Sequence, residues 1–267
     1  MNLKQINGLI LDVDGVLFRG DEEIGDIEMT FQMIQEINLR VIIASNNSTR
    51  NQSYCVERMA SYGARIEPDQ VVTSAIIAVN NLLQMFPQGG AVCVIGETAL
   101  IDTLSSAGFH TTEESGAIAV VVGLDRGLTY EKLKKAALQI QNGALFIATN
   151  ADRAVMTPEG LIPAAGTIVA ALEAATGVSA RVMGKPQTTM YRFALDVLGL
   201  KPHQVLVVGD QLVTDIACAQ TLGCPTALVL SGVDKKETAI NWSPAVDIIA
   251  SNLSDVVAII VKAKRDL

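Results

Sequence analysis

The sequence has little positive charge and no long hydrophobic run. Lysine and arginine number 20 against 28 aspartate and glutamate residues, which gives a net charge of −8. Nucleic-acid backbones demand clustered Lys and Arg, so the sequence predicts no nucleic-acid partner. The longest apolar runs, such as the one from Ala117 to Gly123, are far shorter than the roughly 20 residues that span a bilayer. We therefore expect no membrane partner either.

Cysteine is also scarce, and the cysteines that occur have no spacing typical of a metal site. They are Cys55, Cys93, Cys218 and Cys224. None forms a CxxC pair or another zinc pattern, and nothing at the N-terminus resembles a signal peptide. The sequence therefore predicts a reduced, cytoplasmic protein.

What the chain does contain is typical of a packed α/β protein. Hydrophobic residues make up 49% of the 267 residues and charged ones 18%. Apolar runs alternate with amphipathic segments, which is the pattern of a parallel sheet with crossover helices. We predict a Rossmann-like doubly wound parallel sheet core with an inserted smaller α/β cap domain. The core would comprise residues 1–74 and 183–267, and the cap residues 75–182.

The most informative stretch is the apolar run that ends in Asp12-Val13-Asp14-Gly15. Residues two apart on a strand point to the same side, so both acids should face the crevice at the carboxyl end of the strand. Ligands bind in that crevice in open α/β sheets. Two neighbouring acids repel unless a cation or a shared proton offsets their charge. The pair therefore indicates a bound cation, an acid and a nucleophile, or both.

Two plainer interpretations of this motif exist. Asp-Gly after a strand is ordinary turn chemistry. A calcium-binding EF-hand loop that begins at Asp12 would need glycine at its sixth position, which is Leu17 here. The sequence excludes the calcium loop, whereas the turn stays an alternative that depends on the rest of the chain.

A second polar turn follows the predicted strand at residues 41–44. It reads Ser45-Asn46-Asn47-Ser48-Thr49-Arg50 and opens a predicted helix. Such residues commonly cap helices. Backbone N–H groups at a helix start, together with the Ser45 hydroxyl, would also form a phosphate cradle.

A third motif, Met183-Gly184-Lys185-Pro186, precedes a predicted helix at residues 187–198. A P-loop is excluded, because Ser179 stands where its first glycine would be and proline follows the lysine. A lysine in a turn is ordinarily a solvated charge. The proline is compatible with the first helical turn, which would fix Lys185 at the helix start, facing a phosphate.

The fourth motif is a buried strand that ends in Gly209-Asp210, with Asp215 five residues further on. Asp215 has a plain explanation as a helix-capping acid. Asp210 repeats the placement of the first motif at the carboxyl end of a strand. The sequence therefore predicts that Asp210 belongs to the same site.

The predicted cap contains a turn that resembles the second motif. Thr149-Asn150-Ala151-Asp152-Arg153 also follows a strand, and we attribute the likeness to chance and shared turn chemistry. Residues 154–165 contain two prolines and a glycine, so we expect an irregular loop that acts as a lid or specificity loop.

These four strand-end motifs, in this order, resemble those of the haloacid dehalogenase superfamily. The fuller strings, such as Leu11-Asp12-Val13-Asp14-Gly15-Val16-Leu17 and Leu230-Ser231-Gly232-Val233, are similar to the NagD-like branch, which includes p-nitrophenyl-phosphatase-type enzymes. The resemblance spans nearly the whole chain, cap included. The second acid and the absence of Lys-Thr-Gly after the first argue against the superfamily's dehalogenases and P-type ATPases.

The resemblance implies a role for each motif residue. Asp12 would attack phosphorus, and Asp14 would protonate the leaving oxygen and then activate water. Mg²⁺ would be held by the Asp12 carboxylate, the Asp14 carbonyl and Asp210, with Asp215 supporting the site from outside. The transferring phosphoryl group and its loop would be held by Ser45, Asn46, Asn47 and Lys185. Contacts to the leaving group would come from Asn150, Asp152, Arg153, Val155 and Met156.

The implied activity is Mg²⁺-dependent hydrolysis of a small phosphomonoester through an aspartyl-phosphate. The partner would be a small phosphorylated metabolite, and a homodimer would form through the cap. Two alternatives stay open from the sequence: a non-catalytic protein that binds phosphometabolites on the same fold, and a phosphotransferase.

Overall fold

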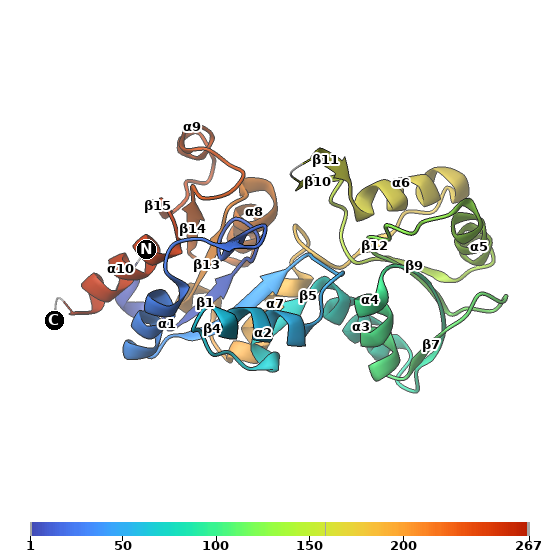
Figure 1. Ribbon diagram of the computed structural model, residues 1–267, viewed down its shortest axis with the longest axis horizontal. Helices are drawn as coiled ribbons and strands as arrows, with labels where there is room; N and C mark the ends of the chain where they lie inside the picture. The colour runs from blue at the N-terminus through green and yellow to red at the C-terminus, as the bar shows by residue number, and fades with distance from the viewer. Residues whose placement is uncertain (1, 158, 266–267) are drawn as a thin grey trace. The chain divides into compact units, whose positions relative to one another are not determined.

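The computed structural model describes residues 2–157 and 159–265, and its chain forms two compact units (Figure 1). The first unit comprises Met1–Ser45, Gln52–Val72 and Lys185–Leu267. The second comprises Asn46–Asn51 and Thr73–Gly184. Among the described residues, no helix is both long and apolar enough to span a membrane.

The first unit is built on a six-stranded sheet in the order β15-β14-β13-β1-β4-β5. Its strands are β1 (Gly8–Leu11), β4 (Arg40–Ser45), β5 (Val71–Thr73), β13 (Val205–Gly209), β14 (Thr226–Val229) and β15 (Ile248–Ala250). β1 pairs in parallel with both neighbours, so that Leu11 lies opposite Ile43 on one side and Val208 on the other. All four residues of β1 are buried, as expected for a central parallel strand that is covered on both faces.

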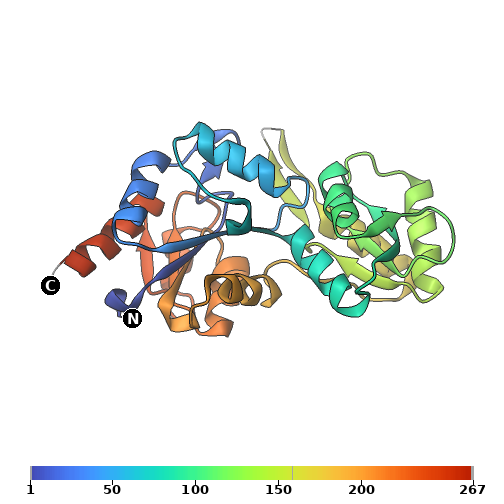
Figure 2. The ribbon, with the colours of Figure 1, turned by 90° about the horizontal axis from the view of Figure 1, so that it is seen from below.

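Helices cover this sheet (Figures 1 and 2). They are α1 (Ile27–Glu36), α2 (Gln52–Ser61), α7 (Thr189–Leu198), α8 (Ala217–Leu222), α9 (Lys236–Ile240) and α10 (Leu253–Arg265). Leu9 and Leu11 pack with Phe31 of α1 and Ile260 of α10 in one hydrophobic cluster. Since side chains alternate along a strand, Ile10 points to the opposite face. The predicted doubly wound α/β fold is confirmed.

The order of the strands places a topological switch between β1 and β13. From β1 the chain continues through α1 to β4 and β5 on one side, whereas β13 is followed by β14 and β15 on the other. Asp12 comes directly after β1, and Asp210 directly after β13. Loops diverge at such a point and leave a crevice at the carboxyl ends of the strands. The fold therefore brings the first and fourth sequence motifs together.

The second unit has its own five-stranded parallel sheet in the order β12-β9-β8-β6-β7. The strands are β6 (Gly90–Ile95), β7 (Phe109–Thr111), β8 (Ala119–Val122), β9 (Leu145–Ala148) and β12 (Arg181–Val182). The helices are α3 (Ser74–Met85), α4 (Thr98–Ser106), α5 (Tyr130–Gln141) and α6 (Ala165–Thr176). Val120 and Val122 of β8 pack with Ile140 of α5 and Ile168 of α6 in the core of this unit.

The expectation of an irregular loop at residues 154–165 is wrong. The segment contains an antiparallel hairpin, β10 (Ala154–Thr157) paired with β11 (Gly160–Pro163). Gly160 has a φ of 119° just after the tip, and Pro163 stands at the end of its strand, opposite Ala154. Glycine and proline in these places do not interrupt the ladder. Pro158 lies outside the described residues.

Several short strands were not predicted. They are β5, β7, β12 and β15, together with a small hairpin of β2 (Phe18–Arg19) and β3 (Glu22–Glu23) after the first motif. Each has only two or three residues, which is too few for an alternating pattern to be recognised. Their position at sheet edges or in loops comes from the tertiary structure.

We predict that the two adjacent isoleucines of α10 differ in their effect on stability. Ile260 is 0% exposed and packs in the core, whereas Ile259 is 40% exposed. Ile260→Ala should lower the free energy of unfolding by about 2–5 kcal/mol, because it leaves a cavity. Ile259→Ala is the matched control and should cost less than about 1 kcal/mol. Urea denaturation measures both, and equal losses would contradict this packing.

Candidate functional site

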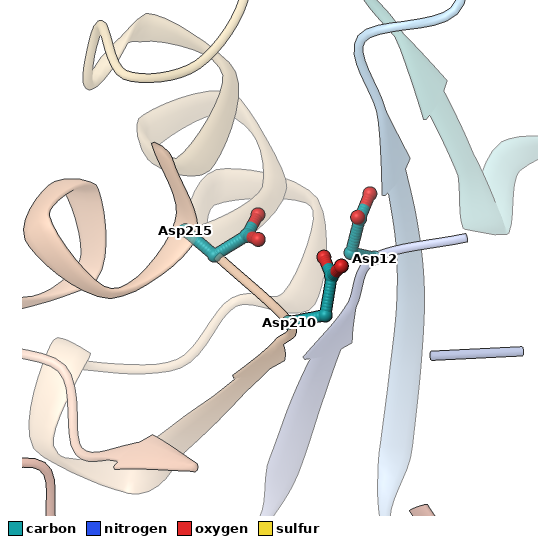
Figure 3. Close-up of side chains that lie close together, drawn as sticks. All are labelled: Asp12, Asp210 and Asp215. Carbon is teal, nitrogen blue, oxygen red and sulfur yellow. The ribbon is translucent and has the colours of Figure 1, made fainter. Parts of the chain in front are cut away.

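Three carboxylates of the first unit lie close together at the end of its sheet (Figure 3). Asp12, Asp210 and Asp215 each offer an oxygen, and these oxygens all lie within 4.8 Å of one another. The residues are only 7%, 1% and 0% exposed, respectively. Asp12 and Asp210 follow the central strands β1 and β13, and Asp215 lies in the π-helical turn Leu212–Ile216 that leads into α8.

The Lys185 side chain is buried in contact with two of these acids. Its ammonium Nζ donates to Asp12 Oδ1 at 2.6 Å, to Asp215 Oδ1 at 2.7 Å and to the Ala44 carbonyl at 3.3 Å. An ammonium has three N–H donors, so these three acceptors account for all of them. The position of the charge is therefore fixed by hydrogen bonds.

The prediction that a helix start fixes Lys185 is wrong. Pro186 does not belong to the first turn of a helix: it follows a cis peptide bond, and α7 begins only at Thr189. Lys185 is held by Asp12 directly after β1, by the Ala44 carbonyl of β4 and by Asp215 in the turn after β13. The helix start does not fix it.

The buried cluster holds three carboxyl groups and one ammonium, and it would carry a net charge of −2 with all three carboxyl groups ionised. Burial, together with the charges of Asp215 and Asp210, raises the pKa of Asp12 well above its usual range, although Lys185 opposes this shift. Burial and the charge of Asp215 raise the pKa of Asp210 to about 6. Although burial disfavours its charge, the Asp12 and Asp215 carboxylates raise the pKa of Lys185, which stays protonated.

Asp210 is the acid of this cluster that best fits a metal ligand. Its Oδ2 accepts from the Val233 N–H at 2.8 Å, whereas its buried Oδ1 has no hydrogen-bond partner among the described residues. A buried acceptor without a partner is costly, and a cation would satisfy it. Carboxylate oxygens are the ligands that Mg²⁺ and Ca²⁺ prefer. The donor set therefore fits a hard divalent cation.

Two glycines let the chain pass close to Asp210. A Cβ on Gly15 would lie 2.4 Å from Asp210 Oδ2, and one on Gly232 only 2.0 Å. Gly15 also has a φ of 83°, which a residue with a side chain rarely adopts. The Ser231 hydroxyl donates to the Gly15 carbonyl at 2.6 Å, so the loop after β14 is tied to the first motif. Both glycines are thus required by the close approach to the carboxylate.

Asp215 differs from Asp210 because both of its oxygens are engaged. Oδ1 accepts from Lys185 and from the Tyr191 hydroxyl at 3.1 Å. Oδ2 accepts from the Gln211 N–H at 3.2 Å. Asp215 therefore supports Lys185, and its oxygens are less suited than those of Asp210 to contact a metal directly.

Sequence reasoning missed Tyr191. It lies on the buried face of α7 with Met190 and Ala194, and from the sequence a tyrosine at this place is interpreted as an ordinary core residue. Burial, together with the charge of Asp215, raises its pKa well above the usual value, so the phenol is a hydrogen-bond donor. The sequence signal that could have identified Tyr191 is a tyrosine on an otherwise apolar helical face, because a buried hydroxyl needs a hydrogen-bond partner.

Asp14 and Ser45 are the other predicted site residues of the first unit. Asp14 follows Asp12 by two residues and is exposed at the surface. Desolvation by the surrounding protein nevertheless raises the pKa of its carboxyl, against the positive charges of Lys185 and Arg58. Ser45 ends β4 and is 7% exposed.

The remaining predicted residues belong to the second unit, where two polar turns contact each other. The Asn150 side-chain amide donates to the Asn46 carbonyl at 2.9 Å, and the Asn46 amide donates to Asp152 Oδ2 at 3.3 Å. Asn47 Oδ1 accepts from the Thr49 N–H at 2.8 Å. The two turns, whose likeness we attributed to chance and shared turn chemistry, thus contact each other directly.

Gly184 allows this contact between the two turns. A Cβ on Gly184 would lie 2.4 Å from Asn46 Oδ1 and 2.7 Å from the Thr149 carbonyl, so only glycine fits.

The other predicted cap residues lie at or in the β10–β11 hairpin. Arg153 is exposed, and Val155 on β10 is 39% exposed. The side chain of Met156 lies outside the described residues.

Comparison with known proteins finds similar sequences over most of the chain. A family model described as haloacid dehalogenase-like hydrolase matches residues 9–110, and a second HAD-hydrolase-like model matches residues 182–256. The acid sugar phosphatase of Staphylococcus aureus (strain USA300) is 33% identical over 239 residues, which cover 90% of this chain and 92% of the relative.

Two solved structures extend the comparison to the whole fold. NagD from Escherichia coli K-12 has a TM-score of 0.85 at 30% identity and covers 94% of this chain and 98% of its own. A glycerol phosphate phosphatase from Mycobacterium tuberculosis, solved in complex with magnesium, has a TM-score of 0.86 at 31% identity. That match covers 94% of this chain and 77% of the other. The predicted resemblance is confirmed, and the chain belongs to the haloacid dehalogenase-like hydrolases.

Proposed function

We propose that this protein hydrolyses small phosphomonoesters with the help of Mg²⁺, through an aspartyl-phosphate formed on Asp12. One observation carries the proposal: a buried cluster of three carboxyl groups and one ammonium, in which Asp210 Oδ1 has no hydrogen-bond partner among the residues that the structure describes. Similarity to an acid sugar phosphatase and a glycerol phosphate phosphatase supports the reaction class. Small phosphorylated metabolites such as sugar phosphates are the proposed substrates.

Asp12 is the proposed nucleophile. Burial makes its carboxylate more basic than an exposed one, while the Lys185 ammonium on Oδ1 favours its ionised form. One Asp12 oxygen would attack phosphorus, and the bond from phosphorus to the ester oxygen would break. The attacking group is then held at a fixed position, so little reorganisation is needed during the reaction.

Asp14 is the proposed general acid and base. Asp14 is an exposed residue and desolvation raises the pKa of its carboxyl, both of which suit a group that exchanges protons with substrate and water. In the first half-reaction it would give its proton to the leaving oxygen. In the second it would take a proton from the water that attacks the aspartyl-phosphate, which restores Asp12 and releases phosphate.

The proposed Mg²⁺ ligands are the Asp12 carboxylate, the Asp14 backbone carbonyl and Asp210, with Asp215 supporting the site through Lys185. When bound, the cation offsets negative charge on the transferring phosphoryl group. Lys185 and the Ser45 hydroxyl would contact the same group, which needs positive charge and hydrogen-bond donors. By resemblance to the family, we assign Asn46 and Asn47, the next residues along the chain, to the phosphate-binding turn.

The proposed specificity cap comprises residues 75–182, which belong to the second unit. The residues assigned to the leaving group are Asn150, Asp152, Arg153, Val155 and Met156. Arg153 is an exposed cation just before the β10–β11 hairpin, so it suits a substrate with an additional anionic group.

We predict that Asp12→Asn abolishes turnover. An amide is a far weaker nucleophile than a carboxylate, so kcat should fall by at least about 10³-fold. Asp196→Asn, on the exposed side of α7, is the matched control and should keep wild-type activity. Phosphate release from a panel of esters measures both, and undiminished hydrolysis by the Asp12 variant would reject the proposed mechanism.

We also predict that the effect of Asp14→Asn depends on the leaving group. For an alkyl phosphate, loss of the acid should lower kcat by about 10²–10⁴-fold. For p-nitrophenyl phosphate the loss should be smaller, since a stable phenolate needs less protonation. Steady-state kinetics with both esters gives the ratio of the two falls in kcat. Equal falls would argue that Asp14 does not protonate the leaving oxygen.

Stabilisation by Mg²⁺ should depend on pH. In the metal-free protein the pKa of Asp210 is about 6, above the ordinary 3.8. Its protonated form therefore stabilises the fold below the ordinary pKa, and this contribution is lost as pH rises through 6. Mg²⁺ needs the ionised form, so it should raise Tm little near pH 5 and more near pH 7.5. Thermal denaturation measures this, and Asp210→Asn should remove most of the Mg²⁺ effect at either pH.

A further inference from the structure

We propose that Tyr191 is a positioning residue for the reaction: its hydroxyl orients Asp215, which in turn holds the Lys185 ammonium against Asp12. The inference rests on the proposed function and extends it to a residue that touches neither substrate nor metal. It makes the chemistry of Asp12 depend on a hydroxyl two hydrogen bonds away from Lys185.

The hydroxyl of Tyr191 is not needed to fill space. Tyr191 is 0% exposed and lies on the apolar face of α7 with Met190, Ala194 and Leu195. Phenylalanine has the same ring and would occupy the same volume. What the hydroxyl adds is one donor, which meets Asp215 Oδ1 at 3.1 Å. A carboxylate only accepts, so the direction of this hydrogen bond is fixed.

Asp215 transmits this contact to Lys185. The same oxygen, Oδ1, accepts from the phenol and from the ammonium, the latter at 2.7 Å. The other oxygen is held by the Gln211 N–H at 3.2 Å, so the carboxylate cannot rotate without losing a partner. Tyr191 and Gln211 therefore fix Asp215 from two sides.

Lys185 completes the connection to Asp12. Its Nζ lies 2.6 Å from Asp12 Oδ1 and 2.7 Å from Asp215 Oδ1, so the position of Asp215 sets the point from which the ammonium reaches Asp12. Without the Tyr191 hydroxyl, Asp215 Oδ1 keeps Lys185 as its partner but loses the donor that fixes its orientation. The ammonium should then be held less firmly against Asp12.

The test compares steady-state kinetics of wild type and Tyr191→Phe on several phosphate esters with Mg²⁺. We expect kcat to fall by about 3- to 10-fold, by the same factor for each ester, with KM within about twofold of wild type. Tyr191→Met also lacks the hydroxyl but packs differently, and it should lose kcat by a similar factor. Tyr130→Phe, at a side chain that is 80% exposed, is the control and should keep wild-type kinetics.

A double-mutant cycle separates this role from a purely structural one. In an Asp215→Ala background the hydroxyl has no carboxylate to orient, so Tyr191→Phe should change the residual kcat by less than about twofold. Each variant is compared per folded molecule, with folding checked by circular dichroism.

Two results would overturn the inference while leaving the proposed function intact: an unchanged kcat in Tyr191→Phe, or the same loss with and without Asp215. A wild-type protein that binds Mg²⁺ but hydrolyses no ester would overturn both.

Discussion

The Lys185 ammonium lies between the Asp12 and Asp215 carboxylates in a region where all three side chains are buried. With Asp210 beside them, the charges of the four groups do not balance, and burial makes that imbalance costly. Folding alone would not favour such a cluster. A ligand that supplies positive charge would explain this composition, and a divalent cation would offset the net charge of −2 that the fully ionised cluster carries.

The fold places this cluster with few residues. Parallel strands β1 and β13 end side by side at the switch point, and the acids follow each strand directly. Gly15 and Gly232 allow two loops to approach Asp210 so closely that any larger residue would clash with its carboxylate. The two carboxylates of the fourth motif then differ in their contacts: Asp210 Oδ1 has no hydrogen-bond partner within the described part of the chain, whereas both oxygens of Asp215 accept hydrogen bonds, from Lys185 and Tyr191 on Oδ1 and from Gln211 on Oδ2.

The sequence predicts those features that depend on local pattern. Buried strands with acids at their carboxyl ends predicted the parallel sheet and the convergence of Asp12 and Asp210, because a strand and its end are local features. The β10–β11 hairpin was not predictable from turn residues, because Gly160 beside the tip and Pro163 at the end of its strand fit a hairpin as well as an irregular loop. Tyr191 reads as an ordinary core residue, because its role depends on Asp215, 24 residues away. The contact between Asn46 and Asn150, 104 residues apart, depends equally on the tertiary structure.

The central claim is that this buried charge cluster makes Asp12 the acceptor of the phosphoryl group. The most direct measurement is to mix the Mg²⁺-loaded protein with substrate, quench it in acid within milliseconds, and locate the phosphoryl group by digestion and mass spectrometry. The account predicts a phosphoryl group on the peptide that contains Asp12, and none in Asp12→Asn. Steady hydrolysis with no phosphorylated protein, or with the phosphoryl group on a different residue, would contradict it.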